Sequence, residues 1–292
     1  MFTIHHSLFI VLPLTPLPLD PLNPVFIMER ALFVSKSKNL KYHIPEFTRL
    51  YFGNEFCERL LPSNQEINTA LAFAIKKGLR FTLVTPYCTE RGLKRVKVLL
   101  KKISQEKPGS EVVVNDWGVL RVLKNSSYDL IPVLGRLLTK IKRGPRLMNM
   151  LDVLPGEAIE YLKSSNLTVP LYAEFLKKSG IERVELDNPL QGFDFEQADK
   201  GIHLSLYIPF AFVTTTRFCL TASCDIPEEK GLIGVFPCKK ECQKYTFYLE
   251  NPVMPVMLIR KGNTVFFKND KIPAGLKEKG VDRIVIQPEV PV

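Results

Sequence analysis

The sequence predicts an α/β protein, and a (β/α) barrel, either distorted or incomplete, is the fold that it favours most. From Met28 onward, short apolar strands rich in β-branched residues alternate with amphipathic helices. This alternation is typical of a mostly parallel sheet whose two faces are both covered. The length of 292 residues suits one such barrel. An open doubly wound sheet is the alternative, but no G-x-G-x-x-G follows the first strand, so a dinucleotide-binding version has no support.

Short apolar segments, several of them followed by glycine or proline, are expected to be the buried strands of this sheet. In order they are Arg49–Phe52, taken as the first strand, then Arg80–Thr85, Glu111–Asn115, Leu130–Leu134, Arg183–Leu186 and His203–Ile208.

Capping signals place the helices between these strands. Ser63 and Glu66 form a capping box before a helix that Gly78 closes, and Thr89 can cap the next helix. Residues Trp117–Leu123 are expected to form turns, and Leu171–Ser179 a helix that ends at Gly180.

The pattern changes after Cys242. Short strands are expected at Thr246–Leu249, Val256–Arg260 and Thr264–Lys268, with Lys261-Gly262-Asn263 as the hairpin turn between the last two. Asp282–Gln287 then has the composition of a strand that closes the barrel.

The first 27 residues differ from the rest of the chain. They hold an apolar run, Leu8–Leu14, and five prolines that interrupt any helix. The segment has no basic start and no small-residue cleavage site, so a secretory signal is the weaker interpretation. We expect residues 1–27 to be a disordered extension or a misassigned start, Met28 to be the functional start, and 28–292 to form a single domain in the cytoplasm.

Composition narrows the classes of function. With 40 Lys and Arg against 30 Asp and Glu the chain carries +10, which favours anionic partners. No stretch approaches the ~20 apolar residues of a membrane span. Only four histidines occur, which weakens any mechanism that needs a histidine base. The motifs of zincins, α/β-hydrolases and P-loop proteins are missing, and no motif supports His43 or His203 as the base of a cysteine peptidase.

The six cysteines are the most informative residues, because four of them fall within 24 residues. These four are Cys219, Cys224, Cys238 and Cys242; Cys57 and Cys88 lie far upstream. Disulfides suit small secreted chains better than this one. Zinc knuckles would show C-x2-C pairs, which are missing. Unevenly spaced thiolates are normal for an iron–sulfur cluster. Buried, unligated thiols suit Cys88 but not a polar, loop-like cluster, so the spacing favours metal or cluster ligation.

These residues resemble a known family. Arg217–Thr221, Pro237–Cys242 and Tyr245 are similar to the cysteine segment of the collagenase-like peptidase family U32. Tyr51–Cys57 resembles that family's first strand and the loop after it. Weaker similarities occur at Thr85-Pro86-Tyr87, Asn115–Leu120 and Val184-Glu185-Leu186, so the resemblance runs from about residue 47 to 288.

The resemblance implies a function despite the peptidase name. Studied members carry a 4Fe–4S cluster and hydroxylate ubiquinone precursors, or bases in tRNA and ribosomal RNA, without oxygen. This chain is similar to the short members of ubiquinone biosynthesis, one of which works with a partner of the same family. The resemblance implies Cys57, Cys219, Cys238 and Cys242 as cluster ligands, with Cys224 as an alternative to Cys219.

Three hypotheses follow from the resemblance. The first is an iron–sulfur hydroxylase, or a subunit of one, that acts on a small aromatic or anionic metabolite. The second is a peptidase, and the third is a noncatalytic cluster-binding partner. RNA is the alternative substrate of the first, because residues 76–146 hold 17 Lys and Arg against five Asp and Glu.

Four other residues are candidates for the site because they follow presumed strand ends. Arg136 and Lys140 could bind a carboxylate or phosphate of the substrate. Asp116 and Glu185 could move protons, although a helix cap or a structural hydrogen bond explains each of them as well. Because a barrel places its chemistry at the carboxyl ends of the strands, Cys57 and the late cysteines are expected to meet at that rim.

Overall fold

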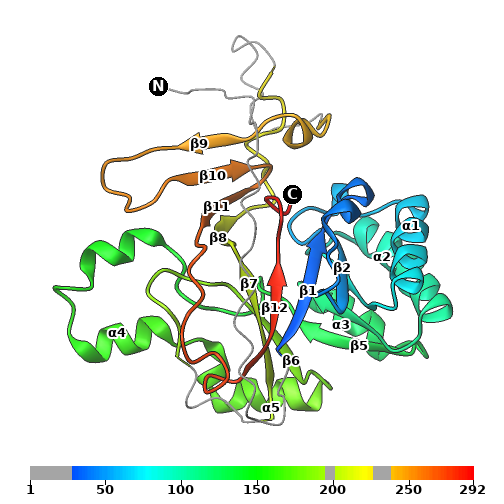
Figure 1. Ribbon diagram of the computed structural model, residues 1–292, viewed down its shortest axis with the longest axis horizontal. Helices are drawn as coiled ribbons and strands as arrows, with labels where there is room; N and C mark the ends of the chain where they lie inside the picture. Colours follow the sequence, from blue (N-terminus) through cyan, green and yellow to red (C-terminus); the bar gives the residue numbers. More distant parts are fainter. Residues whose placement is uncertain (1–27, 195–200, 226–237) are drawn as a thin grey trace.

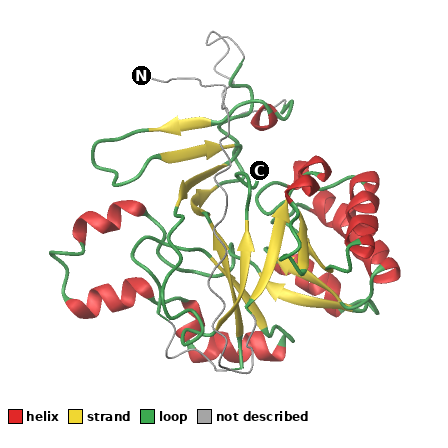
Figure 2. Cartoon of the chain, viewed as in Figure 1, coloured by secondary structure: helices red, strands yellow, loops and turns green. Residues whose placement is uncertain are grey.

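The structure, a computed structural model, describes residues 28–194, 201–225 and 238–292. Its strands form a barrel and a separate small sheet, with most of the helices to the right and lower left of the view (Figures 1 and 2). The predicted extension at 1–27 lies outside the described residues.

The described strands close a parallel barrel in the order β1-β12-β7-β6-β5-β4-β3-β2, which confirms the predicted fold class. These strands are β1 (Glu29–Val34), β2 (Arg49–Gly53), β3 (Arg80–Val84), β4 (Ser110–Val114), β5 (Leu130–Leu134), β6 (Arg183–Leu186), β7 (His203–Ile208) and β12 (Val281–Ile286). Parallel pairing of β1 with both β2 and β12, for example Leu32 with Leu50 and with Ile286, completes the circle.

One barrel strand escaped the sequence patterns. β1 precedes β2, so Arg49–Phe52 belongs to the second strand and not the first. The segment starts with Glu29 and Arg30, and its charges disguise a strand whose last four residues are buried. The charge of Glu29 is accommodated in this strand because Glu29 forms ion pairs with Arg49 and Arg283 inside the barrel.

Helices cover part of the barrel's outside. They are α1 (Asn64–Lys76), α2 (Glu90–Glu106), α3 (Trp117–Lys124), α4 (Gly156–Lys163) and α5 (Pro170–Lys178). The capping box of Ser63 and Glu66 and the Thr89 cap form as predicted. Residues Trp117–Leu123 were wrongly expected to be turns. They form α3 because Asp116 caps the Gly118 N–H and because Val119, Leu120 and Leu123 face the barrel.

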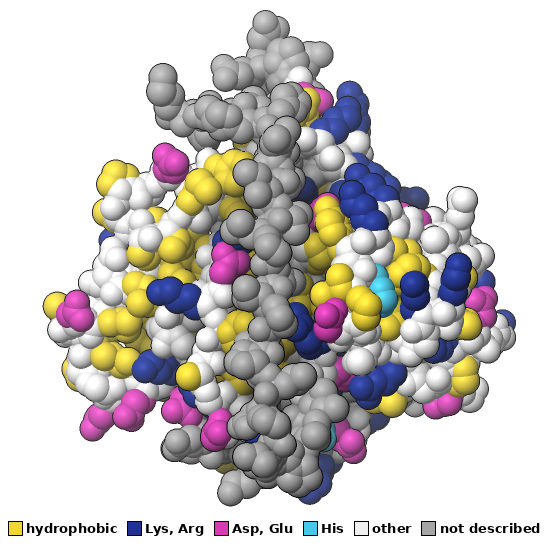
Figure 3. All heavy atoms as spheres, viewed as in Figure 1, with side chains coloured by type: hydrophobic (Ala, Val, Ile, Leu, Met, Phe, Trp, Pro, Cys, Tyr) yellow, Lys and Arg dark blue, Asp and Glu magenta, His cyan; other side chains and the backbone are white. Residues whose placement is uncertain are grey.

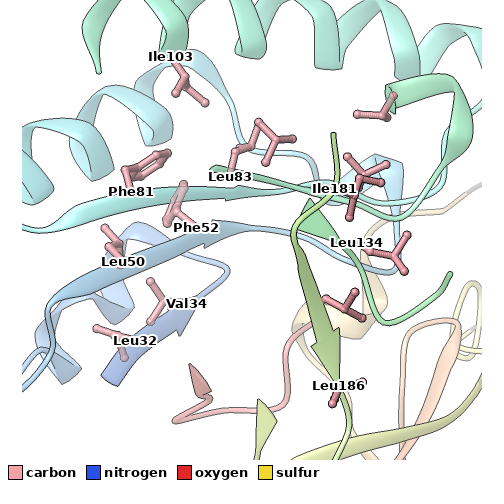
Figure 4. Packing of buried hydrophobic residues seen from close by; sticks show 14 of the residues in the cluster. Leu32, Val34, Leu50, Phe52, Phe81, Leu83, Ile103, Leu134, Ile181 and Leu186 are labelled. Carbon is pink, nitrogen blue, oxygen red and sulfur yellow. The ribbon is translucent and has the colours of Figure 1, made fainter. Parts of the chain in front are cut away.

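Two layers of packing hold the barrel together. Outward-facing residues such as Leu50, Phe52 and Phe81 pack against the helices (Figure 4). Inside the barrel, the rings of Phe33, Tyr51 and Tyr207 contact one another in tilted or edge-on arrangements, with centroids 6.0–6.4 Å apart. The barrel is therefore a filled core, as expected of this fold.

Ion pairs fill one end of the interior. Arg283 donates to Glu29 at 2.7 Å and to Glu111 at 2.7 and 2.9 Å, and Arg49 lies between the same two carboxylates. Burial opposes ionisation of Glu111, but Arg283 and Arg49 outweigh it and lower the pKa of Glu111 to about 2. We call Glu29, Arg49, Glu111 and Arg283 the floor network.

A second, antiparallel sheet has the order β8-β11-β10-β9. Its strands are β8 (Phe210–Thr215), β9 (Phe247–Leu249), β10 (Leu258–Lys261) and β11 (Thr264–Lys268). β8 follows β7 almost directly, so the sheet stands over the end of the barrel to which β12 points (Figure 1). The Lys261-Gly262-Asn263 hairpin forms as predicted, whereas β8 was not expected.

The helices of the described residues were compared with the length and apolar character of a membrane span. None of the helices in these ranges is both long enough and apolar enough to span a bilayer.

Candidate functional site

The structure brings four cysteines to one pocket between the barrel end and the second sheet. Cys57, Cys219, Cys238 and Cys242 all line it, together with Arg59, Arg217 and Lys240 and several apolar residues. The pocket is open to solvent, and its cavity volume is about 80 Å³. One water molecule needs ~10–15 Å³ on this measure, so the cavity has room for several waters or for a group of similar size.

Cys57 lies in the loop after β2, and the conformation of this loop is fixed by Gly53 and Asn54. Gly53 has φ +138°, and a Cβ there would lie 2.2 Å from the Val84 carbonyl oxygen, so this position requires glycine. Asn54 then accepts hydrogen bonds from the N–H groups of Phe56 and Cys57 at 3.1 and 2.8 Å. The loop therefore presents Cys57 at a fixed place beyond the strand end.

The late cysteines lie on two turns joined by a buried carboxylate. Glu241 is only 2% exposed, and its two oxygens accept hydrogen bonds from the Ser223 and Lys239 N–H groups at 2.9 and 3.0 Å. Burial raises the pKa of Glu241, but these backbone donors outweigh burial and lower it. Glu241 thereby links the turn that carries Cys219 to the turn that carries Cys238 and Cys242.

Two residues in these turns hold a backbone conformation that favours glycine. Ser223 and Lys240 both have φ +62°, in the left-handed region. Such residues cost ~1 kcal/mol or more and are kept where the surroundings determine them. Ser223 is next to Cys224, and Lys240 lies two residues from both Cys238 and Cys242.

The β10–β11 hairpin ties the early and late segments together. Asn263 Nδ2 lies 2.7 Å from the Phe56 carbonyl oxygen and 2.6 Å from the Thr216 carbonyl oxygen. Thr221 donates to the Gly262 carbonyl oxygen at 2.8 Å. Asn263 therefore holds the residue before Cys57 and the start of the Cys219 turn at the same point.

The thiols interact with one another electrostatically. Burial, with smaller contributions from the nearby Cys242, Cys219 and Cys238, raises the pKa of Cys57 to about 11. Burial also raises the pKa of Cys219 and of Cys242, and in each case other members of the four contribute. The raised pKa values favour the neutral thiols of Cys57, Cys219 and Cys242, and a bound cation would favour their thiolates instead.

The two other cysteines are placed differently. Cys224 is not among the pocket-lining residues, although it lies close enough to Cys219 to interact with it. Cys88 is buried, and its thiol contacts the Pro86 carbonyl oxygen. Burial, followed by Asp116 and Glu58, raises the pKa of Cys88 to about 12, with no contribution from another cysteine.

The remaining predicted site residues do not join this pocket. Asp116 caps α3, and its second oxygen accepts from the Cys88 N–H at 3.0 Å. Lys140 is exposed and donates to the Leu137 carbonyl oxygen. Arg136 is fully buried against Glu55 and Asp187, so its guanidinium is not open to a ligand here. Their predicted roles in catalysis or substrate binding stay predictions.

Glu185 lies inside the barrel and not at its rim. One carboxylate oxygen accepts from the Tyr51 hydroxyl at 2.9 Å, and the other has no hydrogen-bond partner. Burial raises the pKa of Glu185 to about 7; Glu111 adds to the rise, while Arg283 and Arg183 oppose it. At neutral pH this carboxyl is poised between its two protonation states.

We expect Glu185→Gln to flatten the pH dependence of stability. Because the folded pKa exceeds the unfolded value, the folded state holds the proton more strongly, and stability is lost as pH rises from about 4.5 through 7. The free energy of unfolding that Glu185 contributes at low pH and loses over this range is on the order of 3 kcal/mol. Urea unfolding of both proteins between pH 5 and 8 checks this, and parallel curves for the two proteins would contradict it.

Comparisons with known proteins give limited matches. No family model matches the sequence, and no curated protein does. Among solved structures, the U32 peptidase Mk0906 is similar at 13% identity with a TM-score of 0.48, over 92% of this chain and 95% of that one. A xylose isomerase domain-containing protein from Salmonella typhimurium LT2 is similar at 13% identity with a TM-score of 0.39, over 89% of this chain and 88% of that one.

Proposed function

We propose that this protein is an iron–sulfur protein of the U32 type, in which Cys57, Cys219, Cys238 and Cys242 hold a 4Fe–4S cluster. The observation that carries the proposal is that four thiols from two distant parts of the sequence line one pocket. The activity that we propose is oxygen-independent hydroxylation of a small aromatic or anionic metabolite, such as a quinone precursor. This finer step rests on the sequence resemblance.

The donor set suits a cluster. Thiolates are soft ligands that select iron–sulfur clusters, zinc or copper(I), and the described lining contains no histidine, aspartate or glutamate. Among the described residues, no three His, Cys, Asp or Glu side chains are arranged to hold one metal ion. The all-thiol donor set therefore suits a cluster, and the sequence resemblance is what favours a cluster over a single zinc ion.

The other lining residues would control the properties of the bound group, which supplies one-electron chemistry. Arg59, Arg217 and Lys240 offset the negative charge of four thiolates around a cluster. Leu60, Phe218 and Val292 add apolar surface to the lining of the pocket. Arg217 also lies over the Tyr87 ring at 5.4 Å, which holds one of these charges near the entrance.

Cys219 is the proposed fourth ligand in preference to Cys224. Cys219 lines the pocket and interacts with Cys238, whereas Cys224 lies outside the lining and interacts first with Asp225 and Glu241. The Thr221 hydrogen bond to Gly262 holds the Cys219 turn toward the pocket.

A second chain of the same family is the protein partner that we propose. Val153, Tyr161 and Leu171, around α4 and α5, are each 78% exposed. Figure 3 shows apolar side chains gathered on the α4 side of this face. Large exposed apolar side chains are typical of interaction surfaces where they form one patch.

Anaerobic purification tests the proposed function against its alternatives. We expect a brown protein with absorption near ~410 nm that consumes an aromatic substrate only in its cluster-loaded form. A colourless protein that cleaves casein or gelatin would instead support a peptidase. The site offers little for that alternative, because no histidine is among the described residues that line the pocket.

We expect binding to total cellular RNA to be weak at physiological salt. Part of the basic segment is not at the surface, since Arg136 and Arg143 are buried in ion pairs. Nonspecific affinity from six to ten phosphate contacts falls ~10³–10⁵-fold between 50 and 200 mM salt. Filter binding at both salt concentrations checks this. Saturable binding to one tRNA or ribosomal fragment at 200 mM salt would favour RNA as the substrate.

A further inference from the structure

Arg136 lies where the two cysteine-bearing arms leave the barrel. The early arm is the loop from Glu55 to Cys57 after β2, and the late arm is β8, which leads to Cys219. Arg136 follows β5, and its side chain is fully buried. It therefore belongs to neither arm but is packed beneath both.

The guanidinium of Arg136 is bonded to both arms. Its Nε and one terminal nitrogen donate to the two oxygens of Glu55 at 3.1 and 2.5 Å. The other terminal nitrogen donates to Asp187 at 2.8 Å and to the Phe210 carbonyl oxygen at 3.0 Å. Glu55 is two residues before Cys57, and Phe210 begins β8. Four of the five N–H donors of a guanidinium are thus used on protein groups.

Asp187 extends the same connection along the late arm. The oxygen that accepts from Arg136 also accepts from the Phe212 N–H at 3.2 Å. Its other oxygen accepts from Arg143, which in turn donates to the carbonyl oxygens of Arg136 and Thr139 at 2.8 and 2.6 Å. The first residues of β8 are therefore fixed at both a carbonyl and an N–H group.

Aromatic rings complete the connection. The Arg136 guanidinium lies 4.1 Å from the Tyr207 ring centroid, 5.7 Å from that of Phe56 and 5.9 Å from that of Phe212. The rings of Phe56 and Phe212, one from each arm, meet at 5.4 Å. Because Phe56 directly precedes Cys57, a shift of the guanidinium would move this cysteine.

We propose that Arg136 is a positioning residue that sets the distance between Cys57 and the late cysteines. The inference rests on the proposed function only in assuming that this distance serves a shared bound group. A lysine cannot replace this arginine, since an ammonium is a point donor and cannot hold Glu55 in a two-point contact while also reaching Phe210. The role assigned here differs from direct contact with substrate.

Arg136→Lys and Arg283→Lys form a matched pair for the test. Both arginines are buried and paired with two carboxylates, but Arg283 belongs to the floor network and contacts neither arm. The full-length chain is prepared metal-free, and alkylation of each thiol by N-ethylmaleimide is followed by peptide mass spectrometry. Buried Cys88 is the internal reference. In parallel, iron uptake is titrated with ferrous iron and sulfide under anaerobic conditions.

We expect alkylation of Cys57 to be ~10-fold faster in Arg136→Lys than in Arg283→Lys, with Cys88 unchanged, because a loosened arm opens locally more often. Iron affinity should fall ~10–100-fold in Arg136→Lys alone, as for other residues that orient metal ligands. Arg136→Met should show larger changes in the same direction.

Equal Cys57 alkylation rates in the two lysine variants would overturn the inference, whatever the iron content. If the unmodified chain takes up no iron, the proposed function fails, and the alkylation comparison still decides the role of Arg136.

Discussion

Replacing Cys57 with alanine is expected to remove most of the iron from the protein, as is replacing Cys219, Cys238 or Cys242. Each of these thiols lines the pocket, and three thiolates hold a four-iron cluster poorly. Iron and acid-labile sulfide per folded chain, measured after anaerobic purification, give the result directly. The same samples should lose the absorption near ~410 nm that is typical of a 4Fe–4S cluster.

Two cysteines serve as controls for this prediction. Cys88→Ala should keep its iron, because Cys88 is buried against Pro86 away from the pocket. Cys224→Ala should keep most of it, because Cys224 does not line the pocket. Full iron content in Cys57→Ala would show that the early arm supplies no ligand to the cluster. Full iron in Cys219→Ala together with loss in Cys224→Ala would reverse the assignment of those two.

The second large effect is expected on stability, from Arg283→Met in the floor network. This substitution leaves Glu111 and Glu29, both nearly buried, with Arg49 as their main remaining cation inside the barrel. It also removes the donor that reaches the Tyr51 hydroxyl at 2.5 Å. Removing one partner of a buried ion pair costs ~3–5 kcal/mol of unfolding free energy. Urea unfolding of the two proteins at pH 7 measures the difference.

Arg80→Met is the matched control for that measurement. Arg80 also pairs with Glu29, at 2.8 Å, but its side chain is 62% exposed. Exposed ion pairs contribute only ~0–1 kcal/mol, so this variant should unfold near the midpoint of the unmodified chain. Equal losses in the two variants would mean that burial does not set the strength of these ion pairs.

Local patterns carried the main outline of the barrel. Segments such as Arg80–Thr85 and Leu130–Leu134 are recognisable because strands of parallel sheets are rich in apolar and β-branched residues, and because these two stop at proline or glycine. Ser63 and Thr89 cap their helices through hydrogen bonds to residues three positions away, so both caps can be recognised from the local sequence. The family resemblance implied that Cys57 acts together with the late cysteines, and the rule that loops after parallel strands share one rim explains how they can meet.

Residues that act over long sequence distances could not be recognised in this way. The buried ion pairs of Arg136 could not be predicted, because its partners Glu55 and Asp187 lie 81 and 51 residues away. Glu241 and Asn263 look like ordinary polar residues until the turns they connect are seen together. β1 was missed for the same reason, since the charge of Glu29 is explained only by Arg49 and Arg283.

The ratio of iron and sulfide to protein in the anaerobically prepared chain tests the central claim most directly. If Cys57, Cys219, Cys238 and Cys242 share one cluster, the fully loaded protein should contain about four irons and about four sulfides per chain. It should also show thiolate ligation by Mössbauer spectroscopy. One zinc ion per chain with no sulfide, or no metal under conditions in which the thiols are reduced and the protein is folded, would contradict the account.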